Sequence, residues 1–217
     1  MTKSSIGYQK AVAGGERPTH EDRTRQFYET RAQEYANSTR SRELAPLLED
    51  FSNRIPNGNV LDLGCGAGYD LGALRSRGHA AFGLDYSMPI AKIASVNAQA
   101  PVVVADMRAI PFRATAFDGV WASASLLHLP RSDLVSALSE VRRVLKAGGL
   151  LFASVKTGVG DFFDADGRFF TFYESHDWEK RLTAAGLRPI ATAFNGGVRK
   201  DVRGLPEQWL TSLAVSA

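Results

Sequence analysis

Residues 60–68 read Val-Leu-Asp-Leu-Gly-Cys-Gly-Ala-Gly, and this stretch decides the fold of the chain. Its apolar residues follow a turn signal at residues 56–59, so they indicate a short buried strand. Gly64, Gly66 and Gly68 then allow the backbone to adopt positive φ values or to approach a ligand closely. A helix-like segment over residues 69–77 follows, and its first backbone N–H groups are available to a ligand. The pattern predicts a strand, a tight turn and a helix that together bind a polar molecule.

The spacing of the glycines differs from the dinucleotide-binding pattern Gly-x-Gly-x-x-Gly. The third glycine comes one residue early, and Tyr69 stands where the pattern has glycine or alanine. Asp62 would repel a pyrophosphate and attract an ammonium group. We therefore expect a ligand with a cationic amino-acid end. An NAD-dependent oxidoreductase and an ordinary glycine-rich turn in another α/β protein are the alternatives.

Residues 60–68 resemble motif I of the class I S-adenosylmethionine (SAM) dependent methyltransferases, and the resemblance extends over about residues 24–217. It implies an α/β fold with three layers: a doubly wound, seven-stranded, mostly parallel sheet with an antiparallel last strand, the Rossmann-like methyltransferase fold. It also implies S-adenosyl-L-methionine as the cofactor and methyl transfer to a small organic acceptor. A protein that binds SAM or a nucleoside without catalysis is the alternative function.

Length and composition indicate one domain of an ordinary globular protein. The chain has 217 residues, of which 44% are hydrophobic and 23% charged. We expect a tail over residues 1–19 and a single methyltransferase domain over residues 20–217, with a helical lid at residues 20–52. No apolar run approaches the roughly 18 residues that span a bilayer, and no signal peptide is evident, so the expected location is cytoplasmic.

The single cysteine, Cys65, excludes an internal disulfide and a multi-cysteine metal site, and we expect no metal. The 26 Lys and Arg residues exceed the 23 Asp and Glu residues only slightly, and no basic stripe or appended RNA-binding segment indicates nucleic acid. The expected partner is a small-molecule methyl acceptor. We expect no association with a membrane, and we expect the protein to be a monomer or a homodimer.

Acidic residues end the next two predicted strands, at residues 79–84 and 101–105. Asp85 stands 21 residues beyond Gly64, close to the roughly 20-residue spacing of an acid that holds a ribose diol. The resemblance implies that Asp106 accepts the adenine amino group and that the backbone of Met107 binds the ring. It also places Tyr86 and Met88 beside the adenosine, and Ser87 is a suitable helix N-cap.

The predicted lid contains an amphipathic helix over residues 20–37 and a second helix over residues 41–51. Its tyrosines resemble those that cover the cofactor in small-molecule methyltransferases, although an aromatic stripe packed on the sheet is the alternative. The cofactor-binding residues expected from the turn, the strand ends and the lid are Asp62, Gly64, Cys65, Gly66, Gly68, Asp85, Tyr86, Ser87, Met88, Asp106, Met107, Ser123, Tyr28 and Tyr35.

The fourth predicted strand, residues 116–122, leads into Ser123 and His128, where an acceptor should arrive. His128 is the candidate general base, with a packing or cofactor-contacting role as the alternative. The segment lacks the Asn/Asp-Pro-Pro-Tyr/Phe sequence of methyltransferases that act on adenine or glutamine nitrogen. We therefore do not expect those substrates.

The C-terminal part predicts a helix over residues 132–146, a strand over 150–155, a helix over 176–185, and strands over 188–194 and 208–215. Residues 157–174 combine glycines with many aromatic residues, and we expect a loop that folds over the site. A small core of its own is the alternative. The substrate-binding candidates in this loop are Phe162, Phe163, Phe170 and Tyr173.

Overall fold

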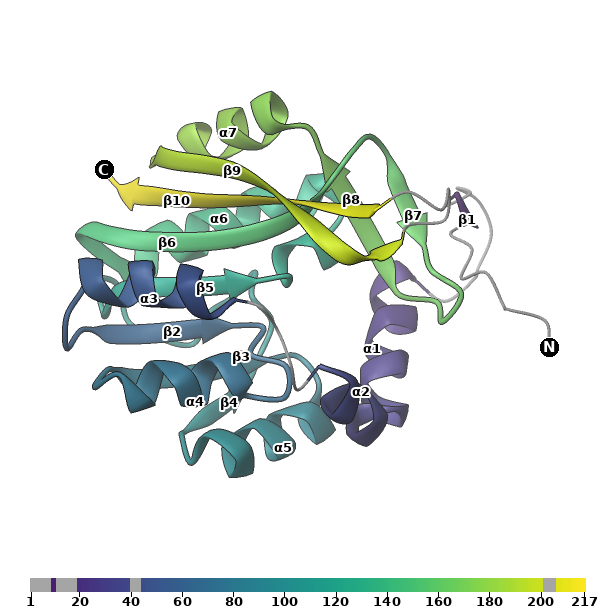
Figure 1. Ribbon diagram of the computed structural model, residues 1–217, viewed down its shortest axis with the longest axis horizontal. Coiled ribbons are helices and arrows are strands. Elements are labelled where there is room, and N and C mark those ends of the chain that lie inside the picture. The colour runs from purple at the N-terminus through teal and green to yellow at the C-terminus, as the bar shows by residue number, and fades with distance from the viewer. Residues whose placement is uncertain (1–8, 11–18, 40–43, 201–205) are drawn as a thin grey trace.

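The computed structural model describes residues 9–10, 19–39, 44–200 and 206–217. Its centre is a sheet with the strand order β4-β3-β2-β5-β6-β10-β9 (Figure 1). Neighbouring strands from β4 to β6 are parallel, whereas β10 runs antiparallel to both β6 and β9. The strands are β2 (Asn59–Leu63), β3 (Ala80–Asp85), β4 (Val102–Val104), β5 (Phe117–Ser123), β6 (Leu145–Thr157), β9 (Leu187–Lys200) and β10 (Pro206–Ser216). The predicted seven-stranded sheet with an antiparallel last strand is confirmed.

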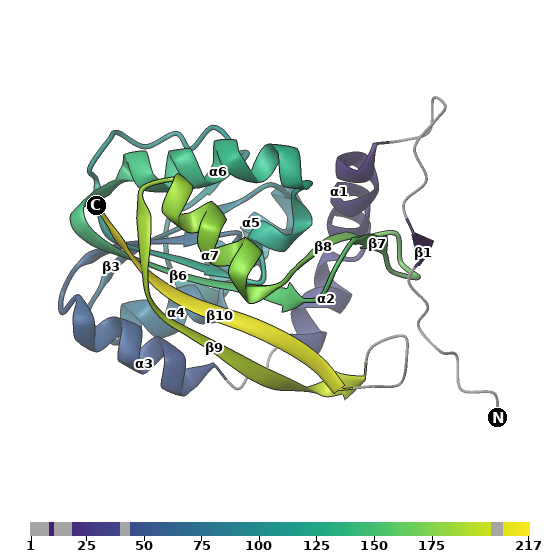
Figure 2. The same cartoon turned by 90° about the horizontal axis from the view of Figure 1, so that it is seen from above.

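Helices cover both faces of the sheet and give three layers (Figure 2). One face carries α3 (Ala45–Arg54), α4 (Tyr69–Ser76) and α5 (Met88–Ala98), and the other carries α6 (Arg131–Val144) and α7 (Ser175–Ala184). None of the described helices is long and apolar enough to cross a membrane.

Side chains of the central strands alternate between the two faces. Trp121 and Phe152 face α3 and α4, and their rings stack with centroids 3.8 Å apart. Val120 and Leu151 face α6 and α7. Burial of each such side chain stabilises the fold by about 1.5–3 kcal/mol. The packed faces therefore hold in place the carboxyl ends of the strands, which together form the rim of the sheet.

The lid differs from the single helix predicted over residues 20–37. The structure has α1 (His20–Thr30) and α2 (Ala32–Ser38), separated at Arg31, whose φ is −118°. The Thr30 hydroxyl donates to the carbonyl oxygen of Gln26 at 2.7 Å, a local bond that bends helices. Both helices lie at the carboxyl ends of the strands (Figure 1), whereas α3 packs on the sheet through Phe51.

The segment 157–174 is a hairpin, so the prediction of a loop was wrong. Its strands are β7 (Asp161–Phe163) and β8 (Phe169–Tyr173), and β8 continues the sheet beside the end of β6. Four of the five residues of β8 are buried, because its rings pack against η1 (Leu126–His128) and α7. A short strand, β1 (Gln9–Lys10), pairs with β7. The rest of the predicted tail, except Thr19, lies outside the described residues.

Two further boundaries differ from the prediction. The helix expected to reach residue 146 ends at Val144, because Leu145 has an extended backbone and already pairs with Phe117 of β5. The second lid helix begins at Ala45 rather than near residue 41, with Pro46 in its first turn, where proline is tolerated.

Candidate functional site

The glycine turn after β2 has a conformation that requires its glycines. Gly64, Gly66 and Gly68 have φ values of 73°, 52° and 81°. A Cβ atom on Gly64 would lie 2.4 Å from Cβ of Ser125, and one on Gly68 would lie 2.7 Å from the carbonyl oxygen of Ala94. Close packing against the end of β5 and against α5 therefore fixes the turn at the start of α4.

Carboxylates lie at or just after the carboxyl ends of the first three parallel strands, as predicted. Asp62 at the end of β2 is buried, with 2% of its surface exposed. Asp85 at the end of β3 accepts backbone N–H groups from Gly66 at 3.0 Å and from Ser87 at 2.9 Å. Burial raises the pKa of Asp85 to about 6, although these N–H groups partly oppose the shift. Asp85 thus joins the glycine turn to the start of α5.

Asp106 follows β4 and is held by its own neighbour. Arg108 donates to it from Nη2 at 2.6 Å and from the backbone at 2.8 Å, and Nη1 of Arg108 donates to Asp133 at 2.6 Å. Burial raises the pKa of Asp106, but the hydrogen bonds from Arg108 outweigh it and lower the pKa overall. The predicted bond from adenine would share these oxygens with Arg108, and that role stays a prediction.

Two adjoining cavities lie along this rim, with volumes of ≈ 110 Å³ and ≈ 20 Å³. Tyr35, Gly64, Gly66 and Ser123 line both. The larger is also lined by the predicted residues Tyr28, Asp85, Tyr86, Ser87, Asp106, Met107 and His128, and the smaller by Asp62 and Cys65. The structure therefore brings the predicted cofactor residues together, except Gly68 and Met88. Gly68 packs on α5, and Met88 is 50% exposed and lines neither cavity.

Two tyrosines of the lid, Tyr28 of α1 and Tyr35 of α2, line the larger cavity, and Tyr35 also lines the smaller one. Tyr28 and Tyr35 pack edge to face with ring centroids 5.0 Å apart. The Tyr35 hydroxyl lies 3.3 Å from the position of a Cβ atom on Gly66, so a side chain at position 66 would press against this ring. Tyr69 donates to the carbonyl oxygen of Ala36 at 3.2 Å, which ties α4 to α2.

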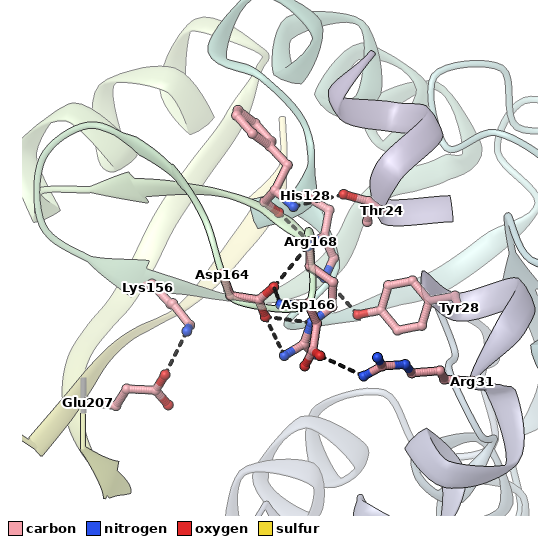
Figure 3. A network of polar contacts seen from close by, with 10 residues as sticks. Thr24, Tyr28, Arg31, His128, Lys156, Asp164, Asp166, Arg168 and Glu207 are labelled. Atoms are coloured by element: carbon pink, nitrogen blue, oxygen red, sulfur yellow. Dashed lines mark hydrogen bonds and ion pairs between the residues drawn. The ribbon is translucent and has the colours of Figure 1, made fainter. Parts of the chain in front are cut away.

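His128 lines the larger cavity, and Figure 3 shows it among its polar partners. Its Nε2 is 3.0 Å from the Tyr28 hydroxyl, and its Nδ1 is 2.7 Å from the carbonyl oxygen of Phe169. Burial is the main cause that lowers the pKa of His128 to about 3, with smaller contributions from Arg168 and Lys156. The imidazole is therefore neutral at physiological pH.

Of the four aromatic residues predicted to bind substrate, only Phe170 lies beside the site, with its ring centroid 4.8 Å from that of His128. Phe162 packs on Phe172 within the hairpin, and Phe163 packs on Phe169. Tyr173 is fully buried against Trp178 of α7. None of these three side chains lines either of the two cavities.

Sequence reasoning missed the irregular segment after β5. Ala124 has a φ of 52°, and its N–H donates to the Ser154 hydroxyl at 2.8 Å. This bend places Ser123 and Ser125 against the glycine turn. Their hydroxyls are buried and have no hydrogen-bond partner among the described residues. The larger cavity is also lined by Thr24, Arg25, Arg108 and Leu129, which the prediction did not include.

These features fit SAM. A buried hydroxyl without a partner is costly, and a polar ligand in the cavity satisfies it. Asp62 in the smaller cavity suits an ammonium group, and Asp85 in the larger cavity suits two neighbouring hydroxyls. Gly64 and Gly66 line both cavities, so a ligand that extends from one cavity to the other would pass the glycine turn.

Comparison with known proteins agrees with this arrangement. The family described as "Methyltransferase domain" matches residues 61–153. A malonyl-[acyl-carrier protein] O-methyltransferase of Erwinia pyrifoliae is 37% identical over 101 residues, covering 46% of this chain and 38% of the relative. An uncharacterised protein of Methanocaldococcus jannaschii is 39% identical over 108 residues, covering 49% of this chain and 41% of the relative. This chain thus matches only about two fifths of the length of these relatives.

A solved structure covers nearly the whole chain. The Burkholderia thailandensis 1,6-didemethyltoxoflavin-N1-methyltransferase, solved with S-adenosylhomocysteine, superposes with a TM-score of 0.76 at 18% identity, over 99% of this chain and 97% of that one. At this identity the likeness concerns the fold. In its sheet, its glycine turn and the matched methyltransferase domain over residues 61–153, the chain is similar to the class I, Rossmann-like SAM-dependent methyltransferases.

Proposed function

We propose that this protein transfers a methyl group from SAM to a small organic acceptor. The observation that carries the proposal is the pair Asp62 and Asp85, which end neighbouring parallel strands on either side of the glycine turn. The match of residues 61–153 to the methyltransferase domain supports it. A protein that binds SAM without catalysis and an NAD-dependent oxidoreductase are the alternatives to exclude.

The residues of the rim hold the cofactor in this proposal. Asp62 binds the ammonium group, Asp85 accepts from the ribose hydroxyls, and Met107 lies at the adenine end. When bound, SAM supplies a methyl group on a sulfonium sulfur that keeps the electron pair as the methyl leaves. The protein aligns the acceptor, which is worth about 7–11 kcal/mol in well-oriented reactions. The lid formed by α1 and α2 excludes competing water.

The relatives suggest two acceptors to test. One relative methylates an oxygen of a malonyl group on acyl-carrier protein, and the structural neighbour methylates N1 of 1,6-didemethyltoxoflavin. Malonyl-pantetheine and 1,6-didemethyltoxoflavin are therefore the first probes for this chain. A monomer or homodimer in the cytoplasm stays a prediction.

Calorimetry with S-adenosylhomocysteine tests binding, and label transfer from methyl-labelled SAM to the two probes tests catalysis. We expect S-adenosylhomocysteine to bind wild type and the surface control Asp50→Asn equally. Asp85→Asn should bind at least about tenfold more weakly, because charged hydrogen bonds contribute roughly 1.5–3 kcal/mol. Binding of NADH in place of S-adenosylhomocysteine would refute the proposal.

A further inference from the structure

Three hydrogen bonds, together with one turn of α1, join four residues in a circuit between the lid and the site. The N–H of Phe169 donates to the Thr24 hydroxyl at 2.8 Å, and the carbonyl oxygen of Phe169 lies 2.7 Å from Nδ1 of His128. Nε2 of His128 lies 3.0 Å from the hydroxyl of Tyr28, which is one helical turn after Thr24 on α1. Figure 3 shows Thr24 and Tyr28 of the lid facing His128 and the hairpin. The circuit thus links α1, β8 and η1.

The partners of His128 determine which of its nitrogens carries the proton. A carbonyl oxygen can only accept, so Nδ1 must carry the hydrogen that it donates to Phe169. In a neutral imidazole Nε2 then has only a lone pair, and the Tyr28 hydroxyl donates to it. Burial raises the pKa of Tyr28, which keeps this phenol protonated. Both ring nitrogens are therefore engaged with protein groups.

The charged groups around His128 oppose its protonation. Arg168 comes from the hairpin and forms an ion pair with Asp164 at 2.6 Å. Lys156 comes from the end of β6, forms an ion pair with Glu207 at 2.6 Å and lies 4.4 Å from the centroid of the Phe170 ring. Both cations disfavour a proton on His128. Tyr28 from α1 is the remaining titratable group in contact with the ring.

We propose that His128 is a positioning residue that holds Tyr28 and the lid over the site, and that it takes no proton from the acceptor. The acceptor then reaches the site with its nucleophilic atom already deprotonated, as a carboxylate oxygen or an unprotonated ring nitrogen. This role replaces the general base predicted for His128. It rests on the proposed function, but the state of His128 can be tested without any acceptor.

Nuclear magnetic resonance of protein labelled with ¹⁵N-histidine measures that state directly. His128→Gln identifies the His128 signals by their loss. We expect the proton on Nδ1, a bare Nε2 and no titration between about pH 5 and pH 8. The exposed residue His176 gives an internal comparison. A proton on Nε2, or titration of His128 in this range, would overturn the positioning role.

Binding of S-adenosylhomocysteine tests whether the circuit holds the lid. The amide oxygen of Gln can still accept a hydrogen bond from the Tyr28 hydroxyl, whereas Leu has no acceptor. His128→Leu and Tyr28→Phe should each weaken binding by about two- to tenfold, and the double variant should be no weaker than either alone. His128→Gln and the control His176→Gln should bind close to wild type. Additive losses in the double variant would show that the two residues act separately and contradict the circuit.

Label transfer to a panel of carboxylates, heteroaromatic nitrogens, phenols and alcohols tests the acceptor class. We expect methylation of carboxylates or ring nitrogens, with His128→Gln retaining a rate within about threefold of wild type. A general base contributes roughly 10²–10⁴-fold. Methylation of a phenol or alcohol that His128→Gln abolishes would refute the inference while leaving the methyltransferase function intact. If the wild-type protein did not bind S-adenosylhomocysteine, that result would instead refute the proposed function.

Discussion

The carboxylate of Asp85 accepts the backbone N–H of Gly66 at 3.0 Å, so the end of β3 is bonded directly to the glycine turn after β2. Burial raises the pKa of this carboxyl to about 6. Donors from a ribose diol favour the ionised form, so a bound ligand should lower that pKa. Affinity for S-adenosylhomocysteine should therefore fall as the pH drops below about 6, by up to roughly tenfold per pH unit.

Calorimetry across this pH range gives the profile, and Asp85→Asn is the control that should remove the dependence. An affinity for wild type that stays constant from pH 8 to about pH 5 would contradict the assignment of Asp85 to the ribose.

Gly64→Ala should destabilise the fold more than Gly148→Ala. Both glycines have φ near 75°, at 73° and 75°, so alanine costs about 1–2 kcal/mol at either position. Only Gly64 is crowded, because its Cβ atom would meet Ser125, whereas nothing lies within 4 Å of a Cβ atom on Gly148. Overpacking should add about 1–3 kcal/mol at Gly64. Urea unfolding measures the difference, and equal losses would contradict the packing described for the turn.

Thr24→Val should loosen the lid locally. The variant leaves the N–H of Phe169 without the hydroxyl that accepts it at 2.8 Å, which costs about 1–3 kcal/mol for a buried group. Hydrogen exchange at the Phe169 amide should accelerate. Thr30→Val serves as the control, because its exposed hydroxyl bonds within α1, to the carbonyl oxygens of Gln26 and Phe27. If the Phe169 amide in Thr24→Val kept the same protection from hydrogen exchange, the result would contradict this hydrogen bond between α1 and β8.

Acid should destabilise the protein partly through His128. Its pKa falls from 6.5 in the unfolded chain to about 3 in the fold, so the unfolded state binds more protons between these values. The stabilisation is complete above pH 6.5 and is lost as the pH falls toward 3. Wild type should lose up to about 2 kcal/mol more than His128→Gln between pH 7 and pH 5.

Chemical unfolding at the two pH values provides this comparison. Asp85 has a raised pKa and acts in the opposite direction, but it is present in both proteins and cancels. Equal pH dependence of the two proteins would mean that His128 is not held neutral.

The sequence predicted the parts of the site that depend on regular elements. Asp62 and Asp85 could be placed because each ends a short apolar strand, and parallel strands end at one edge. The bend at Ala124 could not be predicted, since its positive φ depends on the bond to Ser154 and on no local signal. Ser125 was missed for the same reason.

The hairpin of β7 and β8 was missed because β7 has only three residues and because Gly160 and Gly167 lie close to the starts of the two strands. Phe162, Phe163 and Tyr173 were expected at the site on composition alone, whereas the strand register turns them elsewhere. Phe169 links His128 to Thr24 through its backbone N–H and carbonyl groups. Every residue type other than proline has these groups, so the amino-acid sequence does not indicate the contact.

A crystal structure with S-adenosylhomocysteine tests the central claim most directly. The account predicts the ribose hydroxyls on the Asp85 carboxylate and the amino group of the ligand beside Asp62. A ligand bound away from this rim, or a dinucleotide occupying it while S-adenosylhomocysteine does not bind, would contradict the account.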